Sequence, residues 1–158
     1  MVYDLDSRLV LAKKSGVDIP ADGVVNDVFK IDSPATISAV HFIKLRLFDD
    51  KGKVVNDAFY WRSDNAYKGA WTMTWPSTAG FQQINSLPKV ALNIKSDKTV
   101  TKRKLIVYVN ITNSGTALSF FTELKLQDNK GRNIKPAYFS DNFFCLLPGE
   151  SKKITIEV

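Results

Sequence analysis

The chain has 158 residues, a formal net charge of +6 and 44% hydrophobic residues, a globular composition large enough for one sizeable domain or two small ones. The positive charges are scattered, with no long basic run, so we predict no nucleic-acid partner. No stretch approaches the roughly 20 apolar residues of a membrane-spanning helix, so no membrane partner is predicted.

Alternation of apolar and polar residues with a period of two runs through the chain, and helical periodicity is nearly absent. Ten phenylalanines against three glutamates also favour strands, because aromatic rings suit a half-buried pleated face. In 105–112 every second residue is apolar, which gives the wholly apolar side that a sandwich core requires. The strands predicted in chain order are 24–31, 42–48, 54–61, 90–95, 105–112, 122–127 and 153–158.

Two turns between these strands resemble each other. The pattern Leu-x-Leu-x-Asp-x-Lys-Gly occurs at 45–52 and again at 124–131, a spacing of 79 residues (45 to 124). Aspartate at the start and glycine near the end are typical of tight turns. Residues 2–10 follow the same outline, with Ser7 in the place of glycine. The repetition indicates two copies of one β-module, or hairpin chemistry shared without common ancestry.

The predicted fold is all-β, with two tandem immunoglobulin-like β-sandwich modules. The first module covers 1–62, a linker or interface segment covers 63–87, and the second module covers 88–158. Each module supplies about five strands, whereas an immunoglobulin-like sandwich has seven or more. Either both modules are truncated, the first at its N-terminal strands and the second at its C-terminal strands, or strands are exchanged or paired between copies.

The sequence offers no catalytic or metal centre. A glycosidase needs two carboxylates facing one bond, and the three glutamates lie in a strand (Glu123), a turn (Glu150) and near the chain end (Glu157). One histidine, His41, and one cysteine, Cys145, cannot build a zinc site or a disulfide framework. We therefore expect no catalytic residue, no metal and no cofactor in this chain.

Aromatic residues gather in two places that could contact a ligand. Trp71 and Trp75 lie in the segment between the modules, and Tyr138 precedes the sequence Asp141-Asn142 among further aromatic residues. Such residues can stack on sugar rings, but they more often fill an interface between domains. Asp141 and Asn142 also fit a local Asx-type turn. Carbohydrate contact by these five residues is a hypothesis, and interface packing is the alternative.

The chain resembles the C-terminal immunoglobulin-like domains of glycoside hydrolase family two. The resemblance covers nearly the whole chain and is most specific in the run SDNFFCLLPGES at 140–151. Within the family, the β-mannosidase and exo-β-D-glucosaminidase group is the most similar branch. The segments that carry the resemblance are 2–6, 17–22, 41–61, 81–88 and 138–151.

This resemblance implies a non-catalytic accessory region that is a fragment of a larger β-mannosidase-like or glucosaminidase-like hydrolase. In the family the catalytic glutamates lie in a (β/α)₈ barrel, and no segment of this chain matches that barrel. The barrel is thus an expected partner, and Tyr138, Asp141 and Asn142 could lie at the rim of its active site. The resemblance also implies a periplasmic or extracellular location. The alternatives are a carbohydrate-binding module for β-linked sugars and an adhesion or interaction module.

Overall fold

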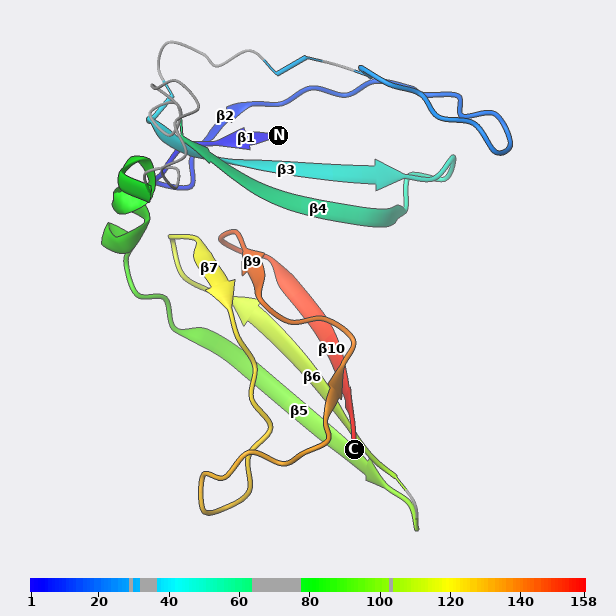
Figure 1. The fold of residues 1–158 in the computed structure, drawn as a ribbon, viewed down its shortest axis with the longest axis vertical. Helices are drawn as coiled ribbons and strands as arrows, with labels where there is room; N and C mark the ends of the chain where they lie inside the picture. Colours follow the sequence, from blue (N-terminus) through cyan, green and yellow to red (C-terminus); the bar gives the residue numbers. More distant parts are fainter. Residues whose placement is uncertain (29, 32–36, 64–77, 103) are drawn as a thin grey trace, which may run out of the picture. The chain divides into compact units, whose positions relative to one another are not determined.

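A computed structural model describes residues 1–28, 30–31, 37–63, 78–102 and 104–158. The chain divides into two compact units, Met1–Ser86 and Leu87–Val158 (Figure 1). Strands dominate both units, so the all-β prediction is confirmed. Of the predicted linker 63–87, residues 64–77 lie outside the described residues, and the remainder forms mainly a 3₁₀ helix, η1 (Thr78–Ser86), which belongs to the first unit.

The first unit contains one antiparallel sheet in the order β2-β1-β3-β4. The hairpin of β3 and β4 pairs Val40 with Ser63 at one end and Leu47 with Asn56 near the other. The hydroxyl of Ser63 donates a hydrogen bond of 2.7 Å to the carbonyl of Gly80 and so ties the end of β4 to η1. The strand bounds are β1 (Val2–Tyr3), β2 (Leu9–Leu11), β3 (Val40–Phe48) and β4 (Val54–Ser63).

The core of the first unit lies around the start of β3. Val2, Val40 and Phe42 are almost inaccessible to solvent, and His41 is buried beside them with its Nδ1 atom 3.3 Å from the Ser38 carbonyl. The far half of the β3–β4 hairpin is exposed on both strands. The described part of this unit contains a single sheet, so the second layer expected for a sandwich is not among these residues.

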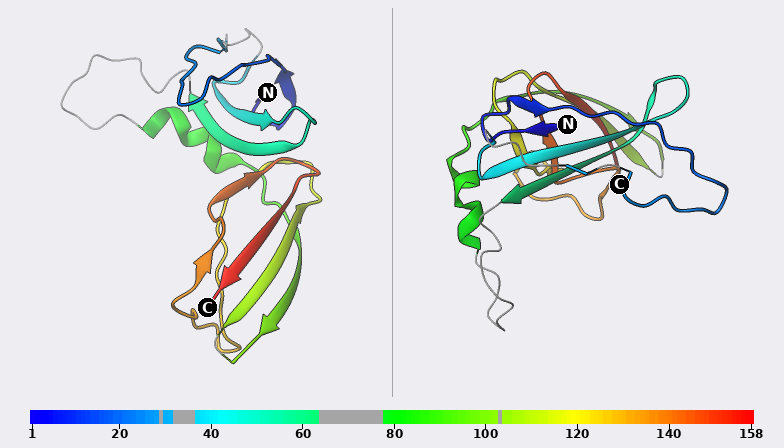
Figure 2. Two further views of the ribbon diagram at one scale, coloured as in Figure 1. Left: turned by 90° about the vertical axis from the view of Figure 1, so that its right-hand side faces the viewer. Right: turned by 90° about the horizontal axis from the view of Figure 1, so that it is seen from above.

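The second unit has two sheets, one in the order β5-β6-β10-β8 and one formed by β7 and β9. The first sheet is antiparallel throughout, and the left view of Figure 2 shows its strands side by side. The bounds are β5 (Leu92–Val100), β6 (Leu105–Asn113), β7 (Ser119–Thr122), β8 (Tyr138–Phe139), β9 (Phe144–Leu146) and β10 (Ser151–Glu157).

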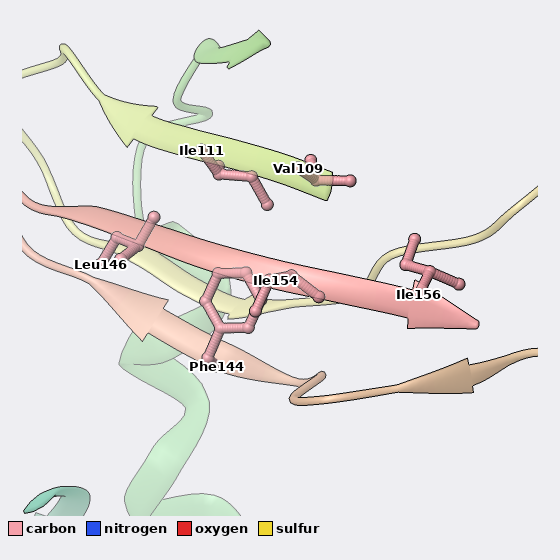
Figure 3. Packing of buried hydrophobic residues seen from close by; sticks show 6 residues of the cluster. All are labelled: Val109, Ile111, Phe144, Leu146, Ile154 and Ile156. Atoms are coloured by element: carbon pink, nitrogen blue, oxygen red, sulfur yellow. The ribbon is translucent and has the colours of Figure 1, made fainter. Parts of the chain in front are cut away.

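The core of the second unit lies between its two sheets. Four of its buried side chains come from β6 and β10, and two come from β9 (Figure 3). Each fully buried side chain of this size stabilises the fold by about 1.5–3 kcal/mol. Alternate residues of β6 face this core, as the sequence predicted. The six residues are Val109, Ile111, Phe144, Leu146, Ile154 and Ile156.

The three related turns, 4–8, 49–53 and 128–132, have the same backbone hydrogen bonds: the N–H of the first residue donates to the carbonyl of the fifth, and the N–H of the fourth donates to the carbonyl of the first. Asp49 accepts backbone N–H bonds from Lys51 and Lys53 on Oδ1 at 3.0 and 2.8 Å, and Asp128 accepts the equivalent bonds from residues 130 and 132 at 2.8 and 3.0 Å. In the first turn, Asp4 accepts the bond from Arg8 at 2.8 Å. The fourth residue of each turn has a positive φ, which is 66° at Ser7, 78° at Gly52 and 75° at Gly131. The predicted similarity of the turns is confirmed.

Two predicted strands are wrong. Residues 24–28 form no strand, and Val24 is 81% exposed, because none of the strands in the described ranges pairs with this segment. The predicted strand 122–127 overlaps the observed strand β7 (Ser119–Thr122) only at Thr122. Further along, Gln127 makes an isolated bridge to Asn133. Alternation of apolar and polar residues therefore predicted a strand in both segments, but it does not provide the neighbouring strand that each would need for pairing.

Among the strands that the structure describes, β5 lies at the edge of its sheet and pairs with β6 alone. Every residue after Leu92 is exposed along this strand, including Ile94 at 55% and Val100 at 68%. Charged residues (Lys95, Asp97 and Lys98) occupy its middle. No helix within the described ranges is long and apolar enough to cross a membrane.

Candidate functional site

The short strand β8 and the loop between β8 and β9 hold three of the five predicted contact residues. Tyr138 begins the short strand β8, pairs with Glu157 of β10 and is 71% exposed. Asp141 and Asn142 follow in the loop that enters β9. Trp71 and Trp75 fall in 64–77, outside the described residues. Of the three that the structure describes, Tyr138 is the most exposed.

The side chain of Asn142 fastens two backbone segments to each other. Its Oδ1 atom accepts hydrogen bonds from the amides of Leu124 at 2.7 Å and Phe143 at 3.0 Å, and its Nδ2 atom donates to the Leu124 carbonyl at 3.1 Å. The amide group therefore replaces the pairing that a strand partner would give to Leu124. These bonds leave Asn142 one amide hydrogen for a ligand.

The carboxylate of Asp141 is also engaged within the fold. Its Oδ1 atom accepts the backbone N–H of Asn142 at 2.7 Å, and Oδ2 forms an ion pair with Lys152 Nζ at 2.5 Å. The same ammonium group lies 5.3 Å from the centre of the Phe144 ring, within the range of a cation–π interaction. The arrangement anchors the loop on the core. The printed bonds of Asp141 and Asn142 to the following amide join neighbouring residues, so they differ from the i to i+2 bond of an Asx-type turn.

Two phenylalanines beside this loop point toward solvent from an unusual backbone. Phe121 has φ +51° and Phe143 has φ +57°, a region in which a bulky side chain costs about 1–3 kcal/mol. Their ring centres are 5.4 Å apart, and the residues are 49% and 50% exposed. A register shift between Ser119 and Thr122 accompanies the turn of Phe121 out of the strand. We call this pair, Phe121 and Phe143, the phenylalanine ridge.

A buried cysteine lies beneath the ridge. The backbone N–H of Phe121 donates to the Sγ atom of Cys145 at 3.4 Å. Cys145 is 8% exposed and sits between the core residues Phe144 and Leu146 of β9. A thiol in this position packs as a small apolar side chain and accepts the N–H of Phe121 at the register shift.

The outer face of the sheet β5-β6-β10 carries a second group of candidates. A shallow depression of about 500 Å³ lies over these strands. Tyr108, which is 48% exposed, lines it together with Asn110. Lys95 and Lys153 flank Asn110 in register on the two neighbouring strands. A combination of one aromatic ring with amide and ammonium hydrogen-bond donors can bind a polar ligand.

The three glutamates have partners inside the second unit. Glu123 pairs with Lys125 at 3.1 Å, and Glu157 pairs with Lys104 at 2.5 Å. The Oε2 atom of Glu150 accepts the backbone N–H of Leu147 at 3.0 Å in a turn. Among the described residues, no group of three or more histidine, cysteine or acidic side chains could hold a metal ion.

Sequence reasoning missed the ridge and the face around Tyr108 as candidate sites. Alternation did place Tyr108 opposite the core residues of β6, so its outward direction was readable from the sequence. The direction of Phe121 was not, because a register shift and a positive φ override the alternation of side chains along a strand. Nothing in the tetrapeptide Ser-Phe-Phe-Thr at 119–122 signals that shift.

Two packed antiparallel sheets define the second unit as an immunoglobulin-like β-sandwich domain. Comparison with known families identifies the family to which this domain belongs. The model of the exo-β-D-glucosaminidase Ig-fold domain matches residues 71–158, and the chain belongs to this family.

Named relatives are similar to 77–98% of the chain but are much longer. The exo-β-D-glucosaminidase of Streptomyces avermitilis is 30% identical over 152 residues, which cover 90% of this chain and 17% of the relative. The enzyme of the same name from Amycolatopsis orientalis is 26% identical, with 98% and 16% covered. That of Hypocrea virens is 29% identical, with 77% and 15% covered. The chain thus spans about one sixth of the length of these relatives.

Solved structures show the same fold. A complex of the Amycolatopsis orientalis exo-chitosanase CsxA with PNP-β-D-glucosamine matches 99% of this chain and 20% of that chain, with a TM-score of 0.80 and 23% identity. Another crystal structure of CsxA matches 83% of this chain and 16% of its own, with a TM-score of 0.70 and 24% identity. The relatives named here are glucosaminidases, and they give no support to the β-mannosidase part of the expectation.

Proposed function

We propose that this chain is a non-catalytic accessory region of a larger exo-acting glycoside hydrolase of the exo-β-D-glucosaminidase type. The observation that carries the proposal is the family match over 71–158, together with relatives of which the chain spans only 15–17%. A region of this kind supports the catalytic barrel of the same polypeptide. Such an enzyme would work in the periplasm or outside the cell, where polymeric amino sugars are accessible.

The chemistry of the second unit supports this structural role. Its three glutamates serve ion pairs and a turn, and Asp141 and Asn142 are engaged in fastening a loop. A hydrolase site instead needs two carboxylates facing one substrate bond. Rigidity is therefore the property that these side chains provide.

The size of the native polypeptide tests the proposal. An antibody raised against the chain should detect one band several times larger than 17.7 kDa in a lysate of the native source. The purified large polypeptide should hydrolyse a p-nitrophenyl β-D-glucosaminide faster than the matching β-D-mannoside, and the 158-residue chain alone should hydrolyse neither. A native band at 17.7 kDa, or hydrolysis by the chain alone, would refute the proposal.

A second candidate function is carbohydrate binding by the outer face of β5, β6 and β10. The depression lined by Tyr108 and Asn110 favours it, because an exposed ring can stack on a sugar. The lining carries two ammonium groups, Lys95 and Lys153, and one carboxylate, Asp97. This net positive charge favours neutral N-acetylated oligosaccharides over cationic amino sugars. Calorimetric titration should then show binding that Tyr108→Ala abolishes. Absence of binding by the unmodified chain removes this candidate.

A further inference from the structure

The second unit carries the whole net charge of the chain. Residues 87–158 contain twelve lysines and arginines against six aspartates and glutamates, so they account for the full +6. Four of the six acidic side chains form ion pairs inside this unit. Their basic partners are Lys104, Lys125, Arg132 and Lys152. The excess positive charge therefore lies at other positions, and Lys95 and Lys153 place part of it on the outer face of the sheet, which is turned away from the core.

The register of three strands aligns a row of polar side chains on this outer face. Asn110 of β6 pairs with Lys95 of β5 on one side and with Lys153 of β10 on the other. Val109 and Ile111, the neighbours of Asn110, enter the core, so the row faces the opposite way. The Cα atoms of the two lysines are about 10 Å apart, because each strand spacing is about 4.8 Å. Within the described part of the chain, the three side chains of the row make no hydrogen bond or ion pair.

A tyrosine and a carboxylate lie next to this row. Tyr108 pairs with Asp97 of β5 and with Thr155 of β10, about 7 Å along the strand from Asn110. These residues line the same depression of about 500 Å³. One oxygen of Asp97 accepts the backbone N–H of Lys98 at 2.7 Å, which leaves the other for a ligand. A sugar ring can stack on the tyrosine and donate its hydroxyls to the carboxylate, while an anionic group on the next sugar meets the lysines.

A second tyrosine extends the outer face beyond the depression. Tyr138 of β8 pairs with Glu157 of β10, the residue after the core residue Ile156, so its ring lies on the outer face. The strand order places β6 and β8 on either side of β10. Tyr138 is therefore two strands and one row away from Tyr108, about 12 Å between Cα atoms. Two rings at this separation serve different sugar residues of one oligosaccharide.

We infer that the outer face of β5, β6, β10 and β8 binds an acidic oligosaccharide in which carboxylate-bearing residues alternate with neutral ones. This inference rests on the second candidate of the proposed function, sugar binding by the same face, and adds the charge of the ligand. Neutral residues stack on the tyrosines, and a carboxylate lies between Lys95 and Lys153. A nucleic acid suits the face less well, because Asp97 beside Tyr108 repels a backbone that is charged at every residue.

Calorimetric titration of the 158-residue chain with hyaluronan hexasaccharide tests the inference, since hyaluronan alternates glucuronate with neutral N-acetylglucosamine. The matched ligand is the same hexasaccharide with its carboxylates converted to methyl esters. The ester should bind about 3- to 10-fold more weakly, because it loses the contacts of two exposed ammonium groups. Equal affinity for acid and ester overturns the inference and leaves binding of neutral sugars standing. Absence of binding by both ligands and by chitin hexasaccharide overturns both.

Substitutions locate the site. Lys95→Gln and Lys153→Gln should each weaken binding of the acid by about two- to five-fold and leave binding of the ester unchanged. Lys130→Gln removes the same charge from an exposed turn of this unit and is the matched control, with no effect expected on either ligand. Tyr108→Ala should abolish binding of both ligands, whereas Tyr108→Phe keeps the ring and should retain it. Unchanged binding in the two outer-face lysine variants, or an equal loss in Lys130→Gln, contradicts the site.

The remaining outcomes test the extent and the occupant of the face. Tyr138→Ala should weaken binding of the hexasaccharide and leave that of the disaccharide unchanged; an equal effect on both contradicts the second platform. Tighter binding of oligothymidylate than of hyaluronan would assign the face to nucleic acid and overturn the inference. Binding by the 158-residue chain that is absent from the intact larger polypeptide would show that another domain covers the face, which also overturns it. A native band at 17.7 kDa refutes the accessory role alone.

Discussion

Replacing Asn142 by alanine distinguishes a structural role from a sugar-binding role. The substitution removes three hydrogen bonds, two of them to the backbone of Leu124. At about 1 kcal/mol net for each bond, and with water replacing part of the loss in a half-buried loop, the free energy of unfolding should fall by about 2–3 kcal/mol. For a unit of this size that loss lowers the melting temperature by about 10 °C or more.

Hydrogen exchange with mass spectrometry measures this loss within the second unit alone, because peptides of β6, β9 and β10 report its opening free energy. Asn129→Ala, at an exposed position of the turn at 128–131, is the matched control and should stay within about 0.5 kcal/mol of the original chain. The reasoning fails if Asn142→Ala is as stable as this control. It also fails if Asn142→Ala keeps its stability and instead loses affinity for a sugar.

Three further predictions concern stability. Asn113→Ala should lower the free energy of unfolding of the second unit by about 3 kcal/mol, measured in urea. The side-chain amide of Asn113 is fully buried, donates to the carbonyls of Ala117 and Leu146 and accepts the N–H of Gly115. A loss under about 1 kcal/mol would contradict this prediction. Ser7→Gly should stabilise the first unit by up to about 1 kcal/mol, because glycine accepts the φ of +66°; a lower melting temperature would argue against strain at this turn. Hydrogen bonds from Arg132, first from its backbone and then from its side chain, lower the pKa of Asp128 below 3.8. The charged carboxylate therefore stabilises the fold above that pH, and this stabilisation disappears as the pH falls through the lowered pKa of the folded chain. Asp128→Asn should therefore lower stability at neutral pH, and the difference from the original chain should shrink in urea titrations at and below pH 3.8; a constant difference would contradict the cause given.

Much of the fold could be predicted because its determinants are local. Alternation located β6 almost to the residue, since 105–112 was predicted and Leu105–Asn113 is observed. The Asp-x-Lys-Gly turns were also readable, because an aspartate that caps its own turn and a glycine with positive φ act within five residues. The turn that contains Ser7 in place of glycine was also predicted, from the similarity of residues 2–10 to the other two turns.

The rest depends on contacts that the local sequence does not encode. The segment 24–31 alternates as a strand does, but a strand forms only where a partner accepts its backbone bonds. The side chain of Asn142 bonds to the backbone of Leu124 across 18 residues, and the local sequence gives no sign of this contact. The outward turn of Phe121 likewise arises from a register shift against β9.

The open edge at β5 has a consequence for how the chain behaves in solution. Its exposed Ile94 and Val100 offer a template for pairing with another copy, while Lys95, Asp97 and Lys98 place hydrated charges along the same strand. Such charges oppose pairing through repulsion and desolvation. The repulsion reaches about 10 Å at 0.1 M salt and about 3 Å at 1 M. We therefore expect added salt to favour edge-to-edge pairing of isolated chains in concentrated solution, and dilute buffer to oppose it.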